Sequence, residues 1–275
     1  MDKTGPLSGK ISGKNRPFAE IVTDARYAVF SVMRTRSAAQ GTFNYWVLGS
    51  GFFVSTKIFL TCAHVLMSPA TPHVDGDTYK LISTTRTTRT VWQVENAVVG
   101  NNIRLFPDSD LALLTVDGGE SRSYLPLEYG DVQVGTEIGV AGYPIPNVPT
   151  VNGNIVLDGL IYRVARNVLT ATYTTNFNTN NGASLTNIPA IEVNFLFVPG
   201  NSGGPIFLAS NGRVIGYVHG FRSYKIEEKM ETAATHLTLP AGMSNSYILS
   251  NSAVYSIGIG MGRVRTHLEQ LGVTL

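Results

Sequence analysis

The feature that most constrains the fold of this chain is a series of short apolar runs that recurs along almost its whole length. Residues 28–34 (AVFSVMR), 58–66 (IFLTCAHVL) and 137–143 (EIGVAGY) are three of them. The runs are rich in β-branched and aromatic residues and are bounded by Gly, Asn, Asp, Ser and Pro, which is typical of short antiparallel strands joined by turns. A hydrophobic content of 43%, a charged content of 15% and 28 glycines favour the same turn-rich β structure.

The runs form two groups of about six each, separated by an exposed connector at residues 121–135. One helix is predicted near the C-terminus, at residues 262–273, because Val264, Leu268 and Leu271 recur at helical spacing and Gly272 follows them. A weaker helical pattern, KIEEKMETAATHL, covers residues 225–237. The chain is therefore predicted to be all-β, with little helix.

The segment VPGNSGGPIF, residues 198–207, combines a potential nucleophile with a flexible backbone. A serine hydroxyl attacks poorly at neutral pH unless a base takes its proton and donors hold the oxyanion that forms. Gly200 can adopt backbone angles that other residues avoid, so its amide and that of Ser202 can point to one place. Gly203 and Gly204 allow close backbone packing behind the serine.

Two upstream motifs supply a candidate base and a candidate orienting acid. His64 follows an apolar run in LTCAHVL, and Asp110 begins another in PDSDLALLTV. Histidine suits the base because its unperturbed pKa of about 6.5 lets it exchange a proton near neutrality. Asp108 competes with Asp110, but it falls in the loop before the apolar run and is expected to be a solvated turn residue.

The order His64, Asp110, Ser202, together with GSGFFV at residues 49–54, resembles the chymotrypsin-like (trypsin-fold) serine proteases, in particular bacterial high-temperature-requirement-type protease domains without a PDZ domain. The resemblance covers residues 20–272. It implies an all-β fold of two six-stranded antiparallel β-barrels with a C-terminal helix, and a site in the cleft between the barrels. The implied division is a tail at 1–19, one barrel at 20–122, and a second barrel with the helix at 123–272.

The resemblance implies a serine endopeptidase that forms an acyl-enzyme on protein or peptide substrates. Ser202 would attack the scissile carbonyl, His64 would transfer the proton, and Asp110 would orient His64. The amides of Gly200 and Ser202 would form the oxyanion hole.

The residue before the nucleophile departs from the digestive members of the family, which carry an aspartate there that pairs with a newly released N-terminal amine. This chain has Asn201, which cannot form that ion pair. The run IVTD at residues 21–24 superficially resembles such a released terminus, but activation by cleavage after Glu20 is not expected. Control by the ordering of loops is the alternative.

The substrate-binding residues implied by the resemblance are Leu196, Phe197, Pro199, His219, Gly220 and Phe221. Leu196 lies six residues before the nucleophile, at the base of the primary specificity pocket (S1), and neither it nor Phe197 offers a carboxylate. An apolar pocket for small or medium aliphatic side chains is expected. Three interpretations of His219 stay open: support of Asp110 by a hydrogen bond, ordinary packing, or recognition of an acidic substrate residue.

Residues 222–253 read as an insertion between two strands of the second barrel. The insertion is either a surface excursion or a lid or docking site for a regulatory partner, since long loops in compact domains are often functional. Two alternatives to a constitutive protease are a catalytically silent module that acts through partner binding and an effector that a partner activates.

Several partners and groups are not expected. A net charge of +2 with scattered Lys and Arg argues against nucleic acid. No apolar run reaches the ~18 residues of a membrane span, and no secretory leader is visible, so a cytoplasmic location is expected unless a leader has been removed. No cofactor motif occurs, and His73, His236 and His267 lack metal-ligand spacing and are expected on the surface or in helices. The single cysteine, Cys62, is expected to be a small buried hydrophobe rather than a catalytic group.

Overall fold

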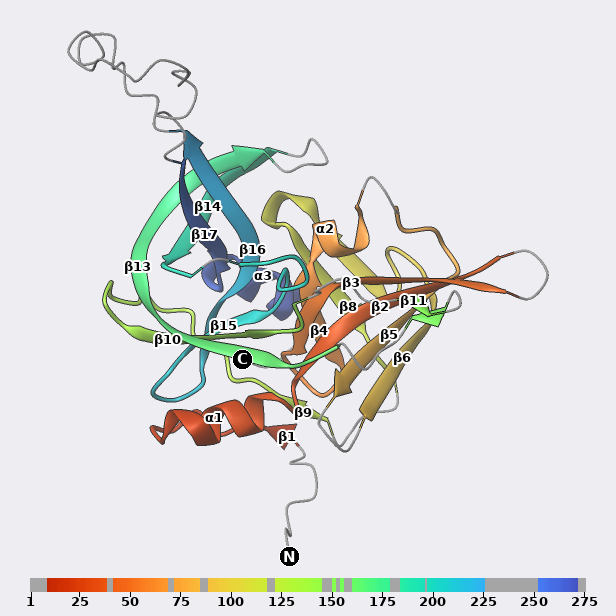
Figure 1. Cartoon of the computed structure of the whole chain (residues 1–275), viewed down its shortest axis with the longest axis horizontal. Coiled ribbons are helices and arrows are strands. Elements are labelled where there is room, and N and C mark those ends of the chain that lie inside the picture. The colour runs from red at the N-terminus through yellow and green to blue at the C-terminus, as the bar shows by residue number, and fades with distance from the viewer. Residues whose placement is uncertain are drawn as a thin grey trace, which may run out of the picture.

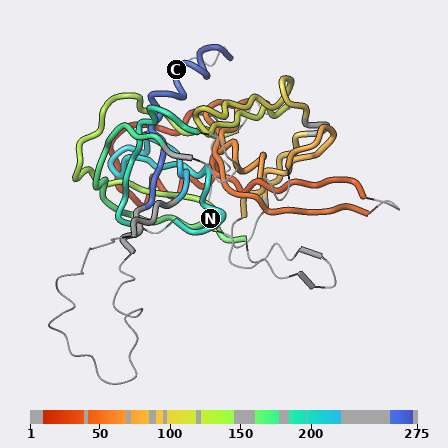
Figure 2. The backbone as a smooth tube through the Cα atoms, turned by 90° about the horizontal axis from the view of Figure 1, so that it is seen from above, coloured from red at the N-terminus to blue at the C-terminus, as the bar shows by residue number. Residues whose placement is uncertain are grey.

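Two β-sheet units stand side by side in the computed structural model (Figure 1). The structure describes residues 9–38, 42–68, 72–84, 89–117, 122–144, 150–151, 154–155, 160–178, 184–195, 197–225 and 252–271. In the view turned by 90° (Figure 2), the first two strands of the N-terminal unit, Val29–Ser37 and Phe43–Phe53, form a hairpin that projects away from the rest of the chain. Within the described ranges, no helix is long and apolar enough to cross a membrane.

The N-terminal unit is a seven-stranded antiparallel sheet with the order β6-β5-β2-β3-β4-β8-β7. Its strands are β2 (Val29–Ser37), β3 (Phe43–Phe53), β4 (Ile58–Cys62), β5 (Asp77–Thr84), β6 (Arg89–Ala97), β7 (Ile103–Phe106) and β8 (Leu111–Thr115). The all-β architecture is as predicted, with seven strands in this sheet where six were predicted. The apolar runs of the sequence cover β2, β3, β4, β6 and β8, and they include neither β5 nor the short β7.

The C-terminal unit is a closed antiparallel barrel of six strands, as predicted. Its strands, in the order of the barrel, are β10 (Glu137–Gly142), β13 (Arg163–Asn178), β14 (Ser184–Val193), β17 (Ser252–Gly260), β16 (Val214–Lys225) and β15 (Pro205–Leu208). The barrel closes because β15 pairs back onto β10. Strands β16 and β17 include both ends of the predicted insertion 222–253; residues 226–251, with most of the weaker helical pattern, lie outside the described residues.

Two short strand pairs and four helical segments complete the described fold. β1 (Gly9–Lys10) pairs with β9 (Ser123–Tyr124), and β11 (Thr150–Val151) pairs with β12 (Asn154–Ile155). The helical segments are α1 (Phe18–Ala25), α2 (Ala63–Leu66), the 3-10 turn η2 (Pro107–Ser109) and α3 (Gly262–Gln270). Helix α1 was not predicted, and it includes residues on both sides of the predicted domain boundary at 19/20. The domain boundaries at 19/20 and 122/123 remain predictions.

The predicted C-terminal helix is confirmed as α3, with Val264 and Leu268 fully buried. Two side chains of α3, one aromatic and one cationic, also contact the N-terminal unit. His267 stacks on Phe106 of β7 at 3.9 Å between ring centroids, and Arg263 donates to the carbonyl of Asp108. The helix therefore contacts both units near the loop that carries Asp110, and not only the second barrel.

Candidate active site

The pairing of β4 with β8 brings His64 and Asp110 together. Cys62 and Leu111 are partners in this antiparallel ladder, and the next residues continue the contact through a 3.0 Å hydrogen bond from the Ala63 amide to the Asp110 carbonyl. Strand β4 then turns into the single helical turn α2, which carries His64. Asp110 has a φ of 45°, a left-handed conformation that Asp tolerates better than most residues.

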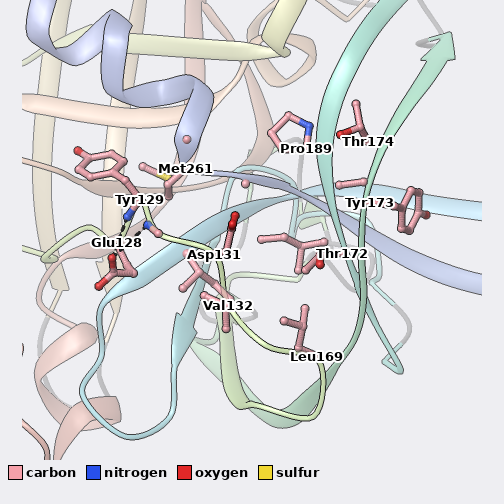
Figure 3. A pocket seen from close by; sticks show the side chains of 16 residues that line it. Glu128, Tyr129, Asp131, Val132, Leu169, Thr172, Tyr173, Thr174, Pro189 and Met261 are labelled. Atoms are coloured by element: carbon pink, nitrogen blue, oxygen red, sulfur yellow. Dashed lines mark hydrogen bonds between the residues drawn. The ribbon is translucent and has the colours of Figure 1, made fainter.

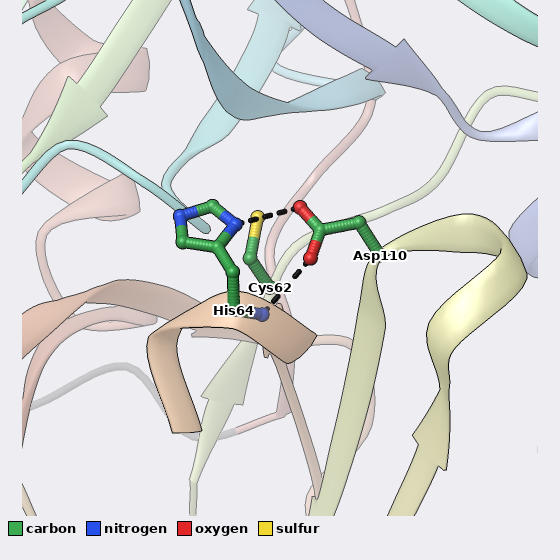
Figure 4. Close-up of side chains that lie close together, drawn as sticks. All are labelled: Cys62, His64 and Asp110. Atoms are coloured by element: carbon green, nitrogen blue, oxygen red, sulfur yellow. Dashed lines mark hydrogen bonds and ion pairs between the residues drawn. The ribbon is translucent and has the colours of Figure 1, made fainter. Parts of the chain in front are cut away.

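Both carboxylate oxygens of Asp110 accept hydrogen bonds from His64 (Figure 4). The His64 amide donates to Oδ1 at 2.9 Å, and the ring Nδ1 donates to Oδ2 at 2.7 Å. Asp110 is 2% exposed, whereas the His64 side chain is 31% exposed and so remains accessible to a substrate. Asp108 is exposed, as predicted, and its carbonyl accepts from Arg263.

A second imidazole binds the same carboxylate oxygen. His219, on β16, places Nδ1 2.6 Å from Oδ2 of Asp110, and its ring meets the ring of His64 edge to face at 5.5 Å. The geometry matches the interpretation in which His219 supports Asp110. Among the described residues, Asp110 thus accepts hydrogen bonds from the amide and ring of His64 and from the ring of His219.

The charges of this cluster follow from those contacts. Burial raises the pKa of Asp110, but His64 and His219 lower it by more, so the pKa lies well below the usual carboxyl range and the group is ionised. Burial lowers the pKa of His64, but the charge and the hydrogen bond of Asp110 outweigh burial and raise it above its ordinary value. The pair therefore stabilises a protonated His64.

Cys62 is buried, as predicted, beneath this pair. Its thiol donates to the carbonyl of Val218 at 3.1 Å, and burial, with the charge of Asp110, raises the thiol pKa well above its usual range. Cys62, His64 and Asp110 place their potential ligand atoms within 4.8 Å of one another. However, Nδ1 and Oδ2 are 2.7 Å apart, closer than the about 3.3 Å that separates two ligands on a tetrahedral zinc. The contact is that of a hydrogen-bonded pair.

The segment before the nucleophile forms a tight turn. The Asn201 amide donates to the Val198 carbonyl at 3.1 Å, with Pro199 second and Gly200 third in the turn. Gly200 has a φ of 95°, so the arrangement is that of a type II turn. The sequence order Pro-Gly therefore specifies this turn locally.

Gly203 packs directly behind the nucleophile. It has a φ of 83°, and a Cβ there would lie 2.3 Å from the Ser50 carbonyl oxygen and 2.4 Å from Oγ1 of Thr61. No side chain fits between the nucleophile and β3. The prediction of close backbone packing at this position is confirmed.

The Gly200 and Ser202 amides have no hydrogen-bond acceptor among the residues that the structure describes. The Gly204 amide donates to the Asn201 carbonyl at 2.8 Å. That carbonyl and the Ser202 N–H belong to the same trans peptide and point in opposite directions, so the Ser202 N–H points away from Gly204. Both amides are therefore available to an external acceptor.

The Ser202 hydroxyl donates a long 3.4 Å hydrogen bond to the carbonyl of His219. Within the described ranges, it makes no hydrogen bond with His64. Hydrogen bonds between a nucleophile and its base are often long or poorly aligned until a substrate binds. The structure thus brings His64 and Asp110 together through two hydrogen bonds, while the Ser202 hydroxyl is bonded to the His219 carbonyl.

The predicted substrate-binding residues lie in different environments. Leu196 lies outside the described residues, and Phe197 is 3% exposed and packs in the core of the barrel. Pro199 is exposed, while His219 and Gly220 are partly exposed; Phe221 lies on β16, opposite Ser256 of β17. The Phe197 side chain packs among apolar residues of the barrel, and its amide donates to the buried Ser256 hydroxyl at 2.7 Å.

Asn201 and Ile21 occupy positions consistent with the absence of a cleavage switch. Asn201 is a buried neutral side chain, 6% exposed. Ile21 lies inside α1 and is 1% exposed, so cleavage after Glu20 would cut this helix.

One prediction about the other histidines is wrong. The His73 side chain is only 4% exposed, and its Nδ1 is 2.9 Å from the Tyr79 hydroxyl. It belongs to a buried polar cluster that includes Asp77. His267 lies in a helix as predicted, and His236 lies outside the described residues.

Sequence reasoning missed Ser50 and Ser256 as parts of this region. Each is a serine within an apolar strand, a weak signal because such serines commonly face solvent. Both are buried here and hold backbone groups of the segment that leads to Ser202.

Comparisons with known proteins show the family and the fold of the chain. The family model described as "Trypsin-like peptidase domain" matches residues 49–216. The crystal structure of the Rv3671c protease from M. tuberculosis, in its active form, superposes with a TM-score of 0.56 at 17% identity, covering 100% of this chain and 94% of the other. A search of curated protein sequences finds no match.

Proposed function

Because the chain belongs to the trypsin-like peptidase domain family and is a serine protease, we propose that Ser202, His64 and Asp110 form its catalytic triad. In this proposal the protein is an endopeptidase that cleaves protein or peptide substrates through an acyl-enzyme. The observation that carries it is the carboxylate of Asp110, buried and held against His64 Nδ1 at 2.7 Å.

The proposed reaction follows from the position of His64 beside the charged Asp110. His64 Nε2 takes the proton of the Ser202 hydroxyl as Oγ attacks the scissile carbonyl, and the raised pKa of His64 favours the imidazolium that forms. The oxyanion is held by the Gly200 and Ser202 amides. When the intermediate collapses, the imidazolium gives its proton to the leaving amine, and water then hydrolyses the acyl-enzyme in a second, equivalent cycle.

Reaction with a fluorophosphonate probe tests the nucleophile directly. We expect one label per chain, mapped by mass spectrometry of peptides to Ser202, and no label on heat-denatured protein, because reaction requires the folded oxyanion hole and His64. Labelling at another residue, or equal labelling of the denatured protein, would contradict the assignment.

A second candidate, activity that depends on a bound partner or substrate, is favoured by one observation. The Ser202 hydroxyl donates to the His219 carbonyl instead of His64. In this case the free protein would label slowly with the probe, and a peptide substrate or partner would accelerate labelling. A labelling rate independent of such additions supports the constitutive enzyme.

For specificity, we propose an S1 pocket that accepts small or medium aliphatic side chains. The segment that leads to the nucleophile exposes two large apolar side chains, Phe195 at 37% and Val198 at 41%. Leu196, at the expected base of the pocket, adds no charge. A regulatory partner at residues 222–253 remains part of this proposal as the source of any conditional activation.

The role of His219 can be separated from substrate recognition with two variants. His219→Ala removes a donor from Asp110, so we expect kcat to fall about 10-fold, the effect of one hydrogen bond to a charged group. Asp110 then becomes a stronger acceptor for His64, which raises the pKa of His64 and moves the acid limb of the pH–rate profile to higher pH. His219→Asn keeps a donor at the position of Nδ1 and is expected to restore both quantities.

Cleavage-site profiling of the same variants in a peptide library completes the test. Aliphatic residues before the cut are expected in the wild type and in both variants. Enrichment of glutamate in the wild type, lost in both His219→Ala and His219→Asn, would instead identify His219 as the acid-recognising residue.

A further inference from the structure

Ser50, on β3 of the N-terminal unit, uses every polar group it has to bind the C-terminal unit or the neighbouring strand β4. It is fully buried. Its hydroxyl accepts from the Tyr143 amide at 2.8 Å and donates to the Gly200 carbonyl at 2.6 Å. Its amide donates to the Ser202 carbonyl at 2.9 Å, and its carbonyl accepts from Oγ1 of Thr61 at 2.7 Å.

Two of these bonds fall on carbonyls on either side of Asn201. The peptide that joins Gly200 to Asn201 is fixed at both ends, because its C=O is held by the Ser50 hydroxyl and its N–H by the Val198 carbonyl. The carbonyl of Ser202 is held by the Ser50 amide. One buried residue therefore sets the orientation of the backbone on both sides of the nucleophile's own amide.

The surroundings leave space for this contact and for little else. A Cβ at Gly142 would lie 2.9 Å from the Ser50 hydroxyl oxygen, and one at Gly49 would lie 2.9 Å from the Ser202 carbonyl oxygen. The hydroxyl is also the sole side-chain group of Ser50, so replacement by alanine removes its two bonds without adding volume.

We propose that Ser50 is a positioning residue that holds the Gly200 turn in the conformation that aims the oxyanion donors. The inference rests on the proposed function, in which the Gly200 and Ser202 amides stabilise the oxyanion. Without the hydroxyl, the Gly200 carbonyl loses its donor in a buried site, and the peptide rotates toward another donor. The donors then lie away from the developing charge, and displacements of about 1 Å cost on the order of 10²-fold in rate.

The experiment compares Ser50→Ala with a matched control, Ser83→Ala. Ser83 is also a buried serine with two hydrogen bonds, to the Arg26 carbonyl and the Tyr143 hydroxyl, but it does not touch residues 198–204. For Ser50→Ala we expect kcat to fall about 10- to 100-fold with little change in KM. Affinity for a peptide boronate, which mimics the tetrahedral intermediate, is expected to fall by the same factor.

Backbone hydrogen exchange provides a readout that does not depend on activity. Ser50→Ala is expected to accelerate exchange of the Asn201, Gly203 and Gly204 amides, whereas Ser83→Ala is not. If Ser50→Ala does not fold, Ser50→Cys, with a weaker donor in the same place, is measured instead and is expected to show an intermediate loss.

The outcomes separate the two proposals. A wild type that neither cleaves peptides nor binds the boronate would refute the proposed function, while hydrogen exchange would still test the hold of Ser50 on the turn. An active wild type with Ser50→Ala equal to Ser83→Ala in kcat, boronate affinity and exchange would overturn the role of Ser50 alone.

Discussion

Replacement of Ser202 by alanine is expected to lower kcat by about 10⁶-fold while leaving the melting temperature almost unchanged. The hydroxyl makes one long bond, 3.4 Å to the His219 carbonyl, so its removal costs little stability. It is, however, the only group of the proposed triad that can form the acyl-enzyme. The amides of Gly200 and Ser202 remain in place, so a small residual rate from oxyanion stabilisation and substrate binding is expected.

The measurement is the single-turnover cleavage rate of a fluorogenic peptide, with thermal unfolding of the same samples. Ser210→Ala provides the control, since Ser210 is exposed, lies in the turn after β15 and keeps its backbone contact with Arg16. A Ser202→Ala protein that cleaves within tenfold of the Ser210→Ala protein would show that another residue is the nucleophile.

Replacement of Asp110 by asparagine is expected to lower kcat by about 10⁴-fold. An amide at this position presents a donor or a weak acceptor to His64 Nδ1, so the imidazole loses both its orientation and the tautomer in which Nε2 can accept a proton. The change also leaves His219 without its charged partner. Asp108→Asn, at an exposed carboxylate two residues earlier, is the matched control and is expected to have the activity of the wild type.

The pH dependence of kcat/KM gives the sign of the electrostatic effect. In the wild type, Asp110 raises the pKa of His64 above its ordinary value, and activity is expected to fall as the pH drops through that raised value. Asp110→Asn removes the charge and leaves burial as the main influence, so the acid limb of the residual activity should move to lower pH. An acid limb that stays in place would show that Asp110 does not set the pKa of His64.

Hydrogen bonds among residues far apart in the sequence explain why the candidate site was only partly predictable. Ser202, His64 and Asp110 were identified because each belongs to a motif of a few residues. The contacts of His219 with Asp110 and of Ser50 with Gly200 join positions 109 and 150 residues apart, and no local pattern marks them. Phe197 shows the same limit, since its amide binds the hydroxyl of Ser256, 59 residues later.

The sequence by itself determined the all-β class, the six strands of the closed barrel, helix α3, and the turn before Ser202. Each of these follows from alternation, helical spacing or a Pro-Gly pair, which act over a few residues. Only the tertiary structure decided the seventh strand of the N-terminal sheet, the burial of His73 and the second imidazole on Asp110. It also decided the hydrogen bonds from Ser50 of β3 to the turn before Ser202. These contacts depend on how strands of the two units meet. Buried polar groups need hydrogen-bond partners, and here the partners come from distant parts of the sequence.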